Sequence, residues 1–199
     1  MTPQNNNLDK LDLEIVSFGS PAEWEQWLDQ NHANSRGSWL RFYKKGSGIS
    51  SVYYAEALDV ALCYGWIDGQ LKKYDELSYI QRFTPRRPRS LWSKRNIEHV
   101  TRLIKDGRMK PAGLREADAA KADGRWEIAY DSQGAMSAPV DFLKELTKNK
   151  KALAFYKSLN KANQYAIAWR LQTAKRPETR EKRKQEILEM LAREEKFHM

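Results

Sequence analysis

A run of arginines in the middle of the chain is the strongest candidate for binding chemistry. Residues 82–96 contain six basic residues and no acidic one, namely Arg82, Arg86, Arg87, Arg89, Lys94 and Arg95. Pro85 and Pro88 restrict the backbone between the arginines, and Ser90 and Ser93 stand where a helix is expected to begin. Guanidinium groups beside a helix N-terminus favour an anion. The run therefore predicts a phosphate or carboxylate site. The alternative is a structural loop that pairs with the acidic N-terminal half.

An acidic residue upstream offers this run a partner. Asp68 stands early in an expected strand, and the next expected strand returns the chain to Arg82. We therefore expect the Asp68 carboxylate to lie within ion-pair distance of Arg82, Arg86 or Arg87. Such a pair would be structural, because removing one member of a buried pair costs about 3–5 kcal/mol.

The alternative gives Asp68 a chemical role, as a general base in a pocket with Trp66 and Trp92 as stacking walls. No histidine close in sequence completes a dyad with Asp68, and His99 is interpreted as a surface residue. The candidate ligand-binding residues are Trp66, Asp68, Arg82, Arg86, Arg87, Arg89, Ser90, Trp92 and Ser93.

A second basic group lies near the C-terminus. Residues 174–184 contain six basic residues against Glu178 and Glu181. Cations at a helix start are unfavourable for the helix dipole unless an anion or a carboxylate is near. A second binding group is therefore one interpretation, and a solvated charged helix is the other. Its candidate residues are Lys175, Thr179, Arg180 and Arg183.

The charge is divided unevenly along the chain. Residues 1–80 hold 7 basic and 11 acidic residues, a net −4, and residues 81–199 hold 28 and 15, a net +13. An acidic front and a basic back suggest an anionic partner for the back half, and the alternative is a solvated, soluble surface without such a partner. An anionic small molecule, an acidic protein and nucleic acid all qualify, and nucleic acid would bind weakly and without sequence preference.

Composition excludes several classes of protein. A chain of 199 residues with 41% hydrophobic residues can bury a core and is not mainly disordered. It has no apolar run long enough to span a membrane and no signal-peptide pattern at its start. The single cysteine fits a reducing cytoplasm, and we expect no metal and no cofactor. The sequence has no phosphate-loop or dinucleotide-binding motif.

The element pattern predicts an α+β fold, with a small antiparallel sheet flanked by helices and then a helical C-terminal module. Strands are expected over residues 13–18, 38–44, 66–73 and 77–83. Helices are expected from the capping box at Ser20–Glu23, from Ser50 or Ser51 to Gly65, and from Ser90 or Ser93. The expected divisions are a disordered tail at 1–12, an α+β domain at 13–123, a connector at 124–138 and the helical module at 139–199.

Several long motifs resemble a known family. They are Trp39–Lys45, Glu56–Gly69, Arg82–Ser93, Gly107–Gly113 and Ala174–Arg180 with Arg183. Together they resemble the YdeI/OmpD-associated family, often called bacteriocin-protection proteins, over about residues 14–193. The resemblance implies a role in surviving bacteriocin or envelope stress, and it brings no catalytic residues.

The leading functional hypothesis is a cytoplasmic stress-protection protein that binds an anionic ligand or partner through the arginine-rich run. A sequence-independent nucleic-acid-binding accessory protein is the second hypothesis. An enzyme that uses Asp68 is the third, so whether the chain is an enzyme stays open, as does its oligomeric state.

Overall fold

The chain forms the α+β fold that the sequence predicts. The computed structural model describes residues 11–131, 136–174 and 176–198. The first elements are β1 (Ile15–Ser17), α1 (Pro21–Asn31), β2 (Ser38–Tyr43), α2 (Tyr54–Cys63), β3 (Trp66–Lys73), β4 (Ser78–Pro85), α3 (Lys94–Lys105) and α4 (Pro111–Ala122). The later elements are α5 (Val140–Leu146), α6 (Lys150–Ser158), α7 (Lys161–Gln172) and α8 (Pro177–Ala192).

The chain divides into two units. The first holds the described residues up to Trp92 together with Asn96–Ile128, and the second holds Ser93–Arg95 and the described residues from Ala129 onward. The expected disordered tail at 1–12 lies outside the described residues except for its last two. None of the described helices is long and apolar enough to cross a membrane.

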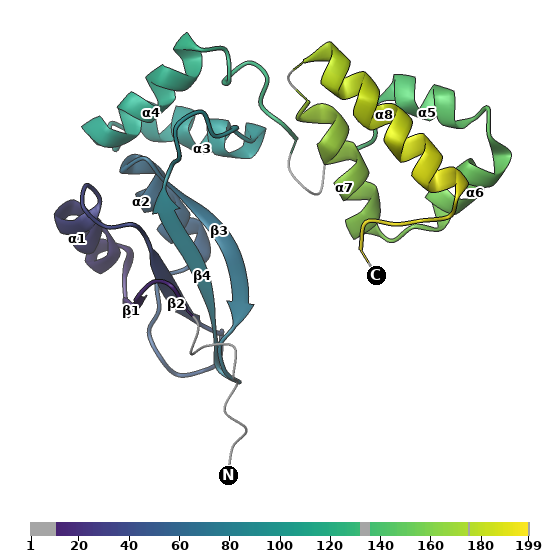
Figure 1. The fold of residues 1–199 in the computed structure, drawn as a ribbon. Coiled ribbons are helices and arrows are strands. Elements are labelled where there is room, and N and C mark those ends of the chain that lie inside the picture. The colour runs from purple at the N-terminus through teal and green to yellow at the C-terminus, as the bar shows by residue number, and fades with distance from the viewer. Residues whose placement is uncertain (1–10, 132–135, 175, 199) are drawn as a thin grey trace. The chain divides into compact units, whose positions relative to one another are not determined.

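In the described residues, four strands form one sheet in the order β1-β2-β4-β3 (Figure 1). β4 pairs antiparallel with β2 and with β3, as expected. β1 pairs with β2 in parallel, because α1 carries the chain back between the two strands. The sheet is therefore mixed, and the expectation of an antiparallel sheet is corrected at this edge.

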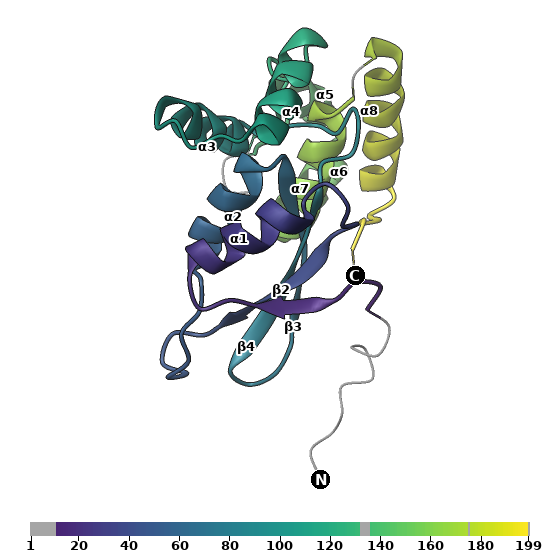
Figure 2. The same cartoon turned by 90° about the vertical axis from the view of Figure 1, so that its left-hand side faces the viewer.

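One face of the sheet is covered by α1 and α2 (Figures 1 and 2). Trp24 of α1 is fully buried and packs edge-on against Phe83 of β4, with ring centroids 5.7 Å apart. Its indole N–H donates to the carbonyl oxygen of Ala57 in α2 over 3.1 Å. Tyr54 at the start of α2 lies against Phe42 of β2, with centroids 6.4 Å apart. The two helices are thereby fixed to the same face and to each other.

The second unit is a cluster of helices with its own apolar core. The core includes Phe142, Leu146, Ile167, Leu171, Ile187 and Leu191. Asn149 and Asn160 cap α6 and α7, because their side chains accept from the backbone N–H groups of Ala152 over 3.1 Å and Asn163 over 3.0 Å. The buried Asn163 side chain also donates to the carbonyl of His198 over 3.2 Å. The expected helical C-terminal module is confirmed.

The end of α2 meets the start of α4 at a close backbone contact. A β-carbon added at Gly113 would lie 2.3 Å from the carbonyl oxygen of Cys63. The backbone N–H of Lys110 donates to that same oxygen over 3.1 Å. Gly65 ends α2 with a left-handed φ of 74°, as its predicted stop requires. These contacts hold the connection between α3 and α4 against the end of α2.

Gly113→Ala should therefore destabilise the protein by about 1–3 kcal/mol, because the added methyl group would overlap packed backbone atoms. Urea unfolding followed by tryptophan fluorescence measures the change. Gly69→Ala is the control: the nearest atom to a β-carbon there lies at 3.6 Å, and the free energy of unfolding should change by less than about 0.5 kcal/mol. Equal stability of the two variants would contradict the tight α2–α4 contact.

Candidate functional site

The arginine-rich run forms a loop between β4 and α3 with a defined backbone. The N–H of Arg86 donates to the carbonyl of Gly65 over 3.0 Å, and the N–H of Ser90 donates to that of Arg87 over 3.0 Å. Arg89 adopts a left-handed φ of 61°, which residues other than glycine keep only where the surroundings enforce it. The loop is therefore a specific turn, and Arg87 and Arg89 are exposed on it.

Arg86 anchors this loop from inside. It is 6% exposed, and its Nη2 donates to the carbonyl oxygen of Leu91 over 2.8 Å. Its guanidinium carbon lies 3.7 Å from the centroid of the Trp92 ring, a close cation–π distance. Arg86, a candidate ligand-binding residue, is therefore buried against Trp92 and holds the loop in place.

A buried arginine outside the run supports the same loop. Arg125 is 4% exposed, and its Nη1 donates to the carbonyl of Ser90 over 2.9 Å. Its Nε donates to both carboxylate oxygens of Asp123 over 2.7 Å. The adjacent Trp126 packs on Trp92 with centroids 5.1 Å apart. The sequence analysis missed these contacts of Arg125 and Trp126, because the segment after residue 124 has no periodicity. The one signal for them was the adjacent pair of a basic and an aromatic residue.

Two arginines of the loop between β4 and α3 stay available to solvent. Neither Arg87 nor Arg89 has a side-chain hydrogen bond or ion pair within the described ranges 11–131, 136–174 and 176–198. Arg82 differs, since its Nη2 pairs with a carboxylate oxygen of Asp12 over 2.8 Å. The loop thus exposes two arginine side chains that are two positions apart in the sequence, with Pro88 between them.

The expected ion pair of Asp68 with Arg82, Arg86 or Arg87 is wrong. The Asp68 carboxylate instead accepts a hydrogen bond from the hydroxyl of Tyr54 over 2.8 Å. This bond ties β3 to the start of α2 on the helix-covered face of the sheet.

A β-bulge explains the error. Counted back from the turn, an unbroken hairpin would place Asp68 opposite Thr84, on the same face as Arg82. The register shifts between Asp68 and Leu71, so that Asp68 lies opposite Phe83. Because side chains alternate between faces along a strand, a shift of one residue moves Asp68 to the face opposite Arg82.

The two tryptophans expected as stacking walls are each 1% exposed. Trp66 packs edge-on against Trp24 and Trp27, with centroid distances of 6.4 and 5.9 Å. Trp92 carries the Arg86 guanidinium on its ring. Both rings have protein neighbours where a ligand was expected.

The serines of the run lie at the entry to α3. Ser90 is half-buried, and Ser93 is buried and directly precedes the first helical residue, Lys94. The helix start expected here is confirmed. Lys94 Nζ pairs with a carboxylate oxygen of Asp131 over 2.7 Å.

Two arginines of the second basic group contact other helices of the C-terminal unit. Arg180 forms a two-pronged pair with Asp141 of α5, with N–O distances of 2.8 and 2.6 Å. Arg183 donates to the carbonyl of Arg170 over 2.9 Å, in the last turn of α7, where helix carbonyls lack partners of their own. Thr179 is exposed on α8, and Lys175 lies outside the described residues.

Sequence reasoning also missed an ionic cluster between α2 and α3. His99 Nδ1 lies 2.7 Å from a carboxylate oxygen of Asp59, and Arg102 Nη2 lies 2.7 and 2.6 Å from its two oxygens. Burial raises the pKa of Asp59, but the hydrogen bonds from Arg102 and His99 outweigh it and leave the pKa below its usual value. Asp59 lies 40 positions before His99 and 43 before Arg102, so no local pattern joins it to them.

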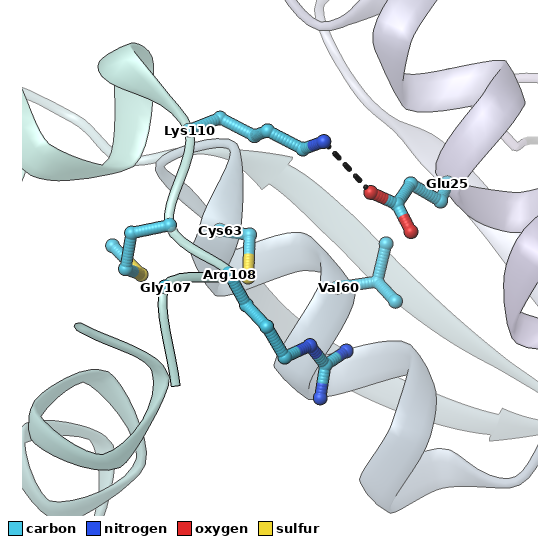
Figure 3. Close-up of a pocket in the computed structure, with 7 residues that line it drawn as sticks. Glu25, Val60, Cys63, Gly107, Arg108 and Lys110 are labelled. Atoms are coloured by element: carbon cyan, nitrogen blue, oxygen red, sulfur yellow. Dashed lines mark ion pairs between the residues drawn. The ribbon is translucent and has the colours of Figure 1, made fainter. Parts of the chain in front are cut away.

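A pocket of about 240 Å³ lies between α1, α2 and the α3–α4 connection (Figure 3). Lys110 Nζ pairs with Glu25 Oε1 over 3.0 Å beside it, and Arg108 and Val60 line it. Cys63 also lines it, and burial raises the pKa of this thiol to about 11. The thiol is therefore neutral at pH 7. No local pattern indicates this pocket, because its lining comes from three separate elements.

The fold and the loop define an α+β protein with a rigid basic turn, followed by a helical module. Residues 16–116, just over half of the chain, match a family described as a domain of unknown function, DUF8412, and the chain belongs to that family. Residues 135–194 match the family described as "Bacteriocin-protection, YdeI or OmpD-Associated".

The expected YdeI/OmpD-associated resemblance is confirmed over the C-terminal part. Most of the motifs that suggested it lie within the segment matched by the domain of unknown function. No curated protein and no solved structure matches the chain.

Arg86→Ala should lower the free energy of unfolding by about 2–4 kcal/mol, because it removes a hydrogen bond from a charged group and a desolvated cation–π contact. Urea unfolding measures the loss. Arg87→Ala, one residue away and exposed, is the matched control and should stay within about 0.5 kcal/mol of the wild type. A stable Arg86→Ala variant would mean that the guanidinium does not anchor the loop.

Asp59→Asn should destabilise the protein by about 1–3 kcal/mol at neutral pH, because it weakens the contacts with Arg102 and His99. The lowered pKa sets the pH dependence. The stabilisation by the carboxylate is complete above the unfolded pKa of about 3.9 and is lost as pH falls through the lower folded pKa. The wild type should therefore melt at a higher temperature than the variant at pH 6. This difference in melting temperature should shrink only near pH 3, where the carboxylate becomes protonated. A gap that does not change with pH would contradict the role of the charge.

Proposed function

We propose that the protein contributes to bacteriocin protection by binding an anionic partner through Arg87 and Arg89. One observation carries the proposal: buried Arg86 and Arg125 each hold a carbonyl of the loop, while the two arginines at the turn keep their guanidinium groups exposed. The family description of residues 135–194 supports the link to bacteriocin protection.

The loop has the properties of a prearranged anion site. A turn that is already ordered loses little conformational entropy when a ligand binds. Each guanidinium can donate two parallel hydrogen bonds to a phosphate or a carboxylate. The net +13 of residues 81–199 would raise the local concentration of anions and speed encounter. The single cysteine fits action in the cytoplasm.

The proposal is tested on the full chain with the double variant Arg87→Ala/Arg89→Ala. Binding of inorganic pyrophosphate, of citrate and of a mixed-sequence single-stranded oligonucleotide is measured by calorimetry at low salt. The double variant should bind the preferred anion about tenfold or more weakly, because charge-assisted hydrogen bonds contribute about 1.5–3 kcal/mol each. Its melting temperature should be unchanged.

Lys105→Ala/Arg115→Ala removes the same charge from exposed positions on α3 and α4 and is the matched control. Equal loss of binding in both double variants would show a general charge effect and reject the loop as the site. If only the oligonucleotide binds, with affinity that falls steeply between about 50 and 200 mM salt, the partner is nucleic acid. In cells that lack the protein, the wild type and the control should restore survival of bacteriocin challenge, and the loop variant should not.

A further inference from the structure

The pocket beside Cys63 carries a charge that its own residues do not balance. Lys110 and Glu25 neutralise each other at 3.0 Å. Arg108 also lines the pocket, and its side chain has no ion pair or hydrogen bond within the residues that the structure describes. In Figure 3 the side chains of Lys110 and Arg108 leave the same connection, with Cys63 between them. One guanidinium charge therefore stays uncompensated at this pocket.

The walls of the pocket are fixed before any ligand arrives. Gly107 turns the chain after α3 with a left-handed φ of 67°. The N–H of Arg108 donates to the carbonyl of Leu103 over 3.0 Å, and the N–H of Lys110 to that of Cys63 over 3.1 Å. The α2–α4 contact at Gly113 leaves no room for the two helices to approach further. A site that needs no rearrangement spends little free energy on ordering.

We propose that this pocket binds a small monocarboxylate, whose carboxylate pairs with Arg108 and whose short aliphatic part lies against Val60, Met109 and the Cys63 thiol. The site is separate from the loop of Arg87 and Arg89, and it does not depend on the function proposed for that loop.

Charge and size select this class of ligand. A planar guanidinium matches a carboxylate with two parallel hydrogen bonds. A single surplus charge suits a monoanion better than a dianion such as phosphate. The volume of about 240 Å³ is below the range of drug-sized pockets. The neutral thiol, Val60 and Met109 offer an apolar wall that a short alkyl chain can cover.

The test uses the full chain and a series of straight-chain carboxylates from acetate to octanoate, with butyramide as the uncharged analogue and inorganic phosphate as the dianion. Calorimetry should show an optimum at a short chain length and little binding of butyramide or phosphate. Arg108→Ala should weaken the best carboxylate about tenfold or more. Arg108→Lys keeps the charge without the planar fork and should bind with intermediate affinity.

Arg115→Ala removes an exposed arginine of α4 outside the pocket and should bind carboxylate as the wild type does. Binding that is equal in Arg108→Ala and Arg115→Ala, or preference for phosphate, would overturn the proposal, as would the absence of carboxylate binding to the wild type. Because Arg108 is exposed and has no described partner, its variants should melt at the wild-type temperature.

Cys63 supplies a second, independent measurement. It is the only cysteine of the sequence, so alkylation by N-ethylmaleimide followed by mass spectrometry reports one position. Its burial and neutral thiol make the reaction slow. A bound carboxylate should slow it further, in proportion to occupancy of the pocket, in the wild type and not in Arg108→Ala. Carboxylate binding without any change in this rate would place the ligand elsewhere and overturn the assignment.

Discussion

The buried indole of Trp24 is the interaction on which most of the N-terminal unit depends. A buried indole N–H needs an acceptor, and it finds one in the carbonyl of Ala57, inside α2, while its ring packs on the sheet. α2 is thereby fixed relative to both α1 and the sheet. Its first residue, Tyr54, can then bond to Asp68 of β3, and its last residue, Cys63, receives the connection that forms the pocket. The indole thus holds the first part of the helix, and separate hydrogen bonds hold its two ends.

Much of the fold could be predicted from local signals, and the exceptions have tertiary causes. The N-cap of α1 at Ser20 and the stop of α2 at Gly65 both hold, because each depends on a few adjacent residues. The predicted capping box is only half formed, since the Glu23 carboxylate accepts from the backbone N–H of Gly19 where a capping box would use that of Ser20. The predicted start of α2 at Ser50 or Ser51 is wrong, since both serine side chains bond to the backbone of other segments and the helix begins at Tyr54. The parallel pairing of β1 likewise depends on where α1 packs, and no local sequence pattern predicts that position.

The candidate site could be located from the sequence, but the roles of its residues could not. The density of arginines and prolines indicated a loop here, and the structure has a turn at this place. Which arginine is buried depends on Trp92. Arg86 packs on the Trp92 ring, and Arg87 is exposed. The error at Asp68 has an equally small cause, because one extra residue in β3 reverses the face on which its side chain lies. Composition and residue spacing do not predict which of two neighbouring arginines is buried. They do not predict a β-bulge either.

Arginines with a side-chain partner hold segments of the protein together, whereas exposed arginines without one can contact a ligand. In the C-terminal unit, which carries the bacteriocin-protection description, Arg180 and Arg183 are used by α5 and α7. In the N-terminal unit, Arg87, Arg89 and Arg108 have no such partner among the described residues. An exposed cation stays hydrated, so it carries no desolvation cost in the folded protein. It makes a favourable contact only when an anion binds. The two anion sites that we propose, at Arg87 with Arg89 and at Arg108, therefore both lie in the segment that matches the domain of unknown function.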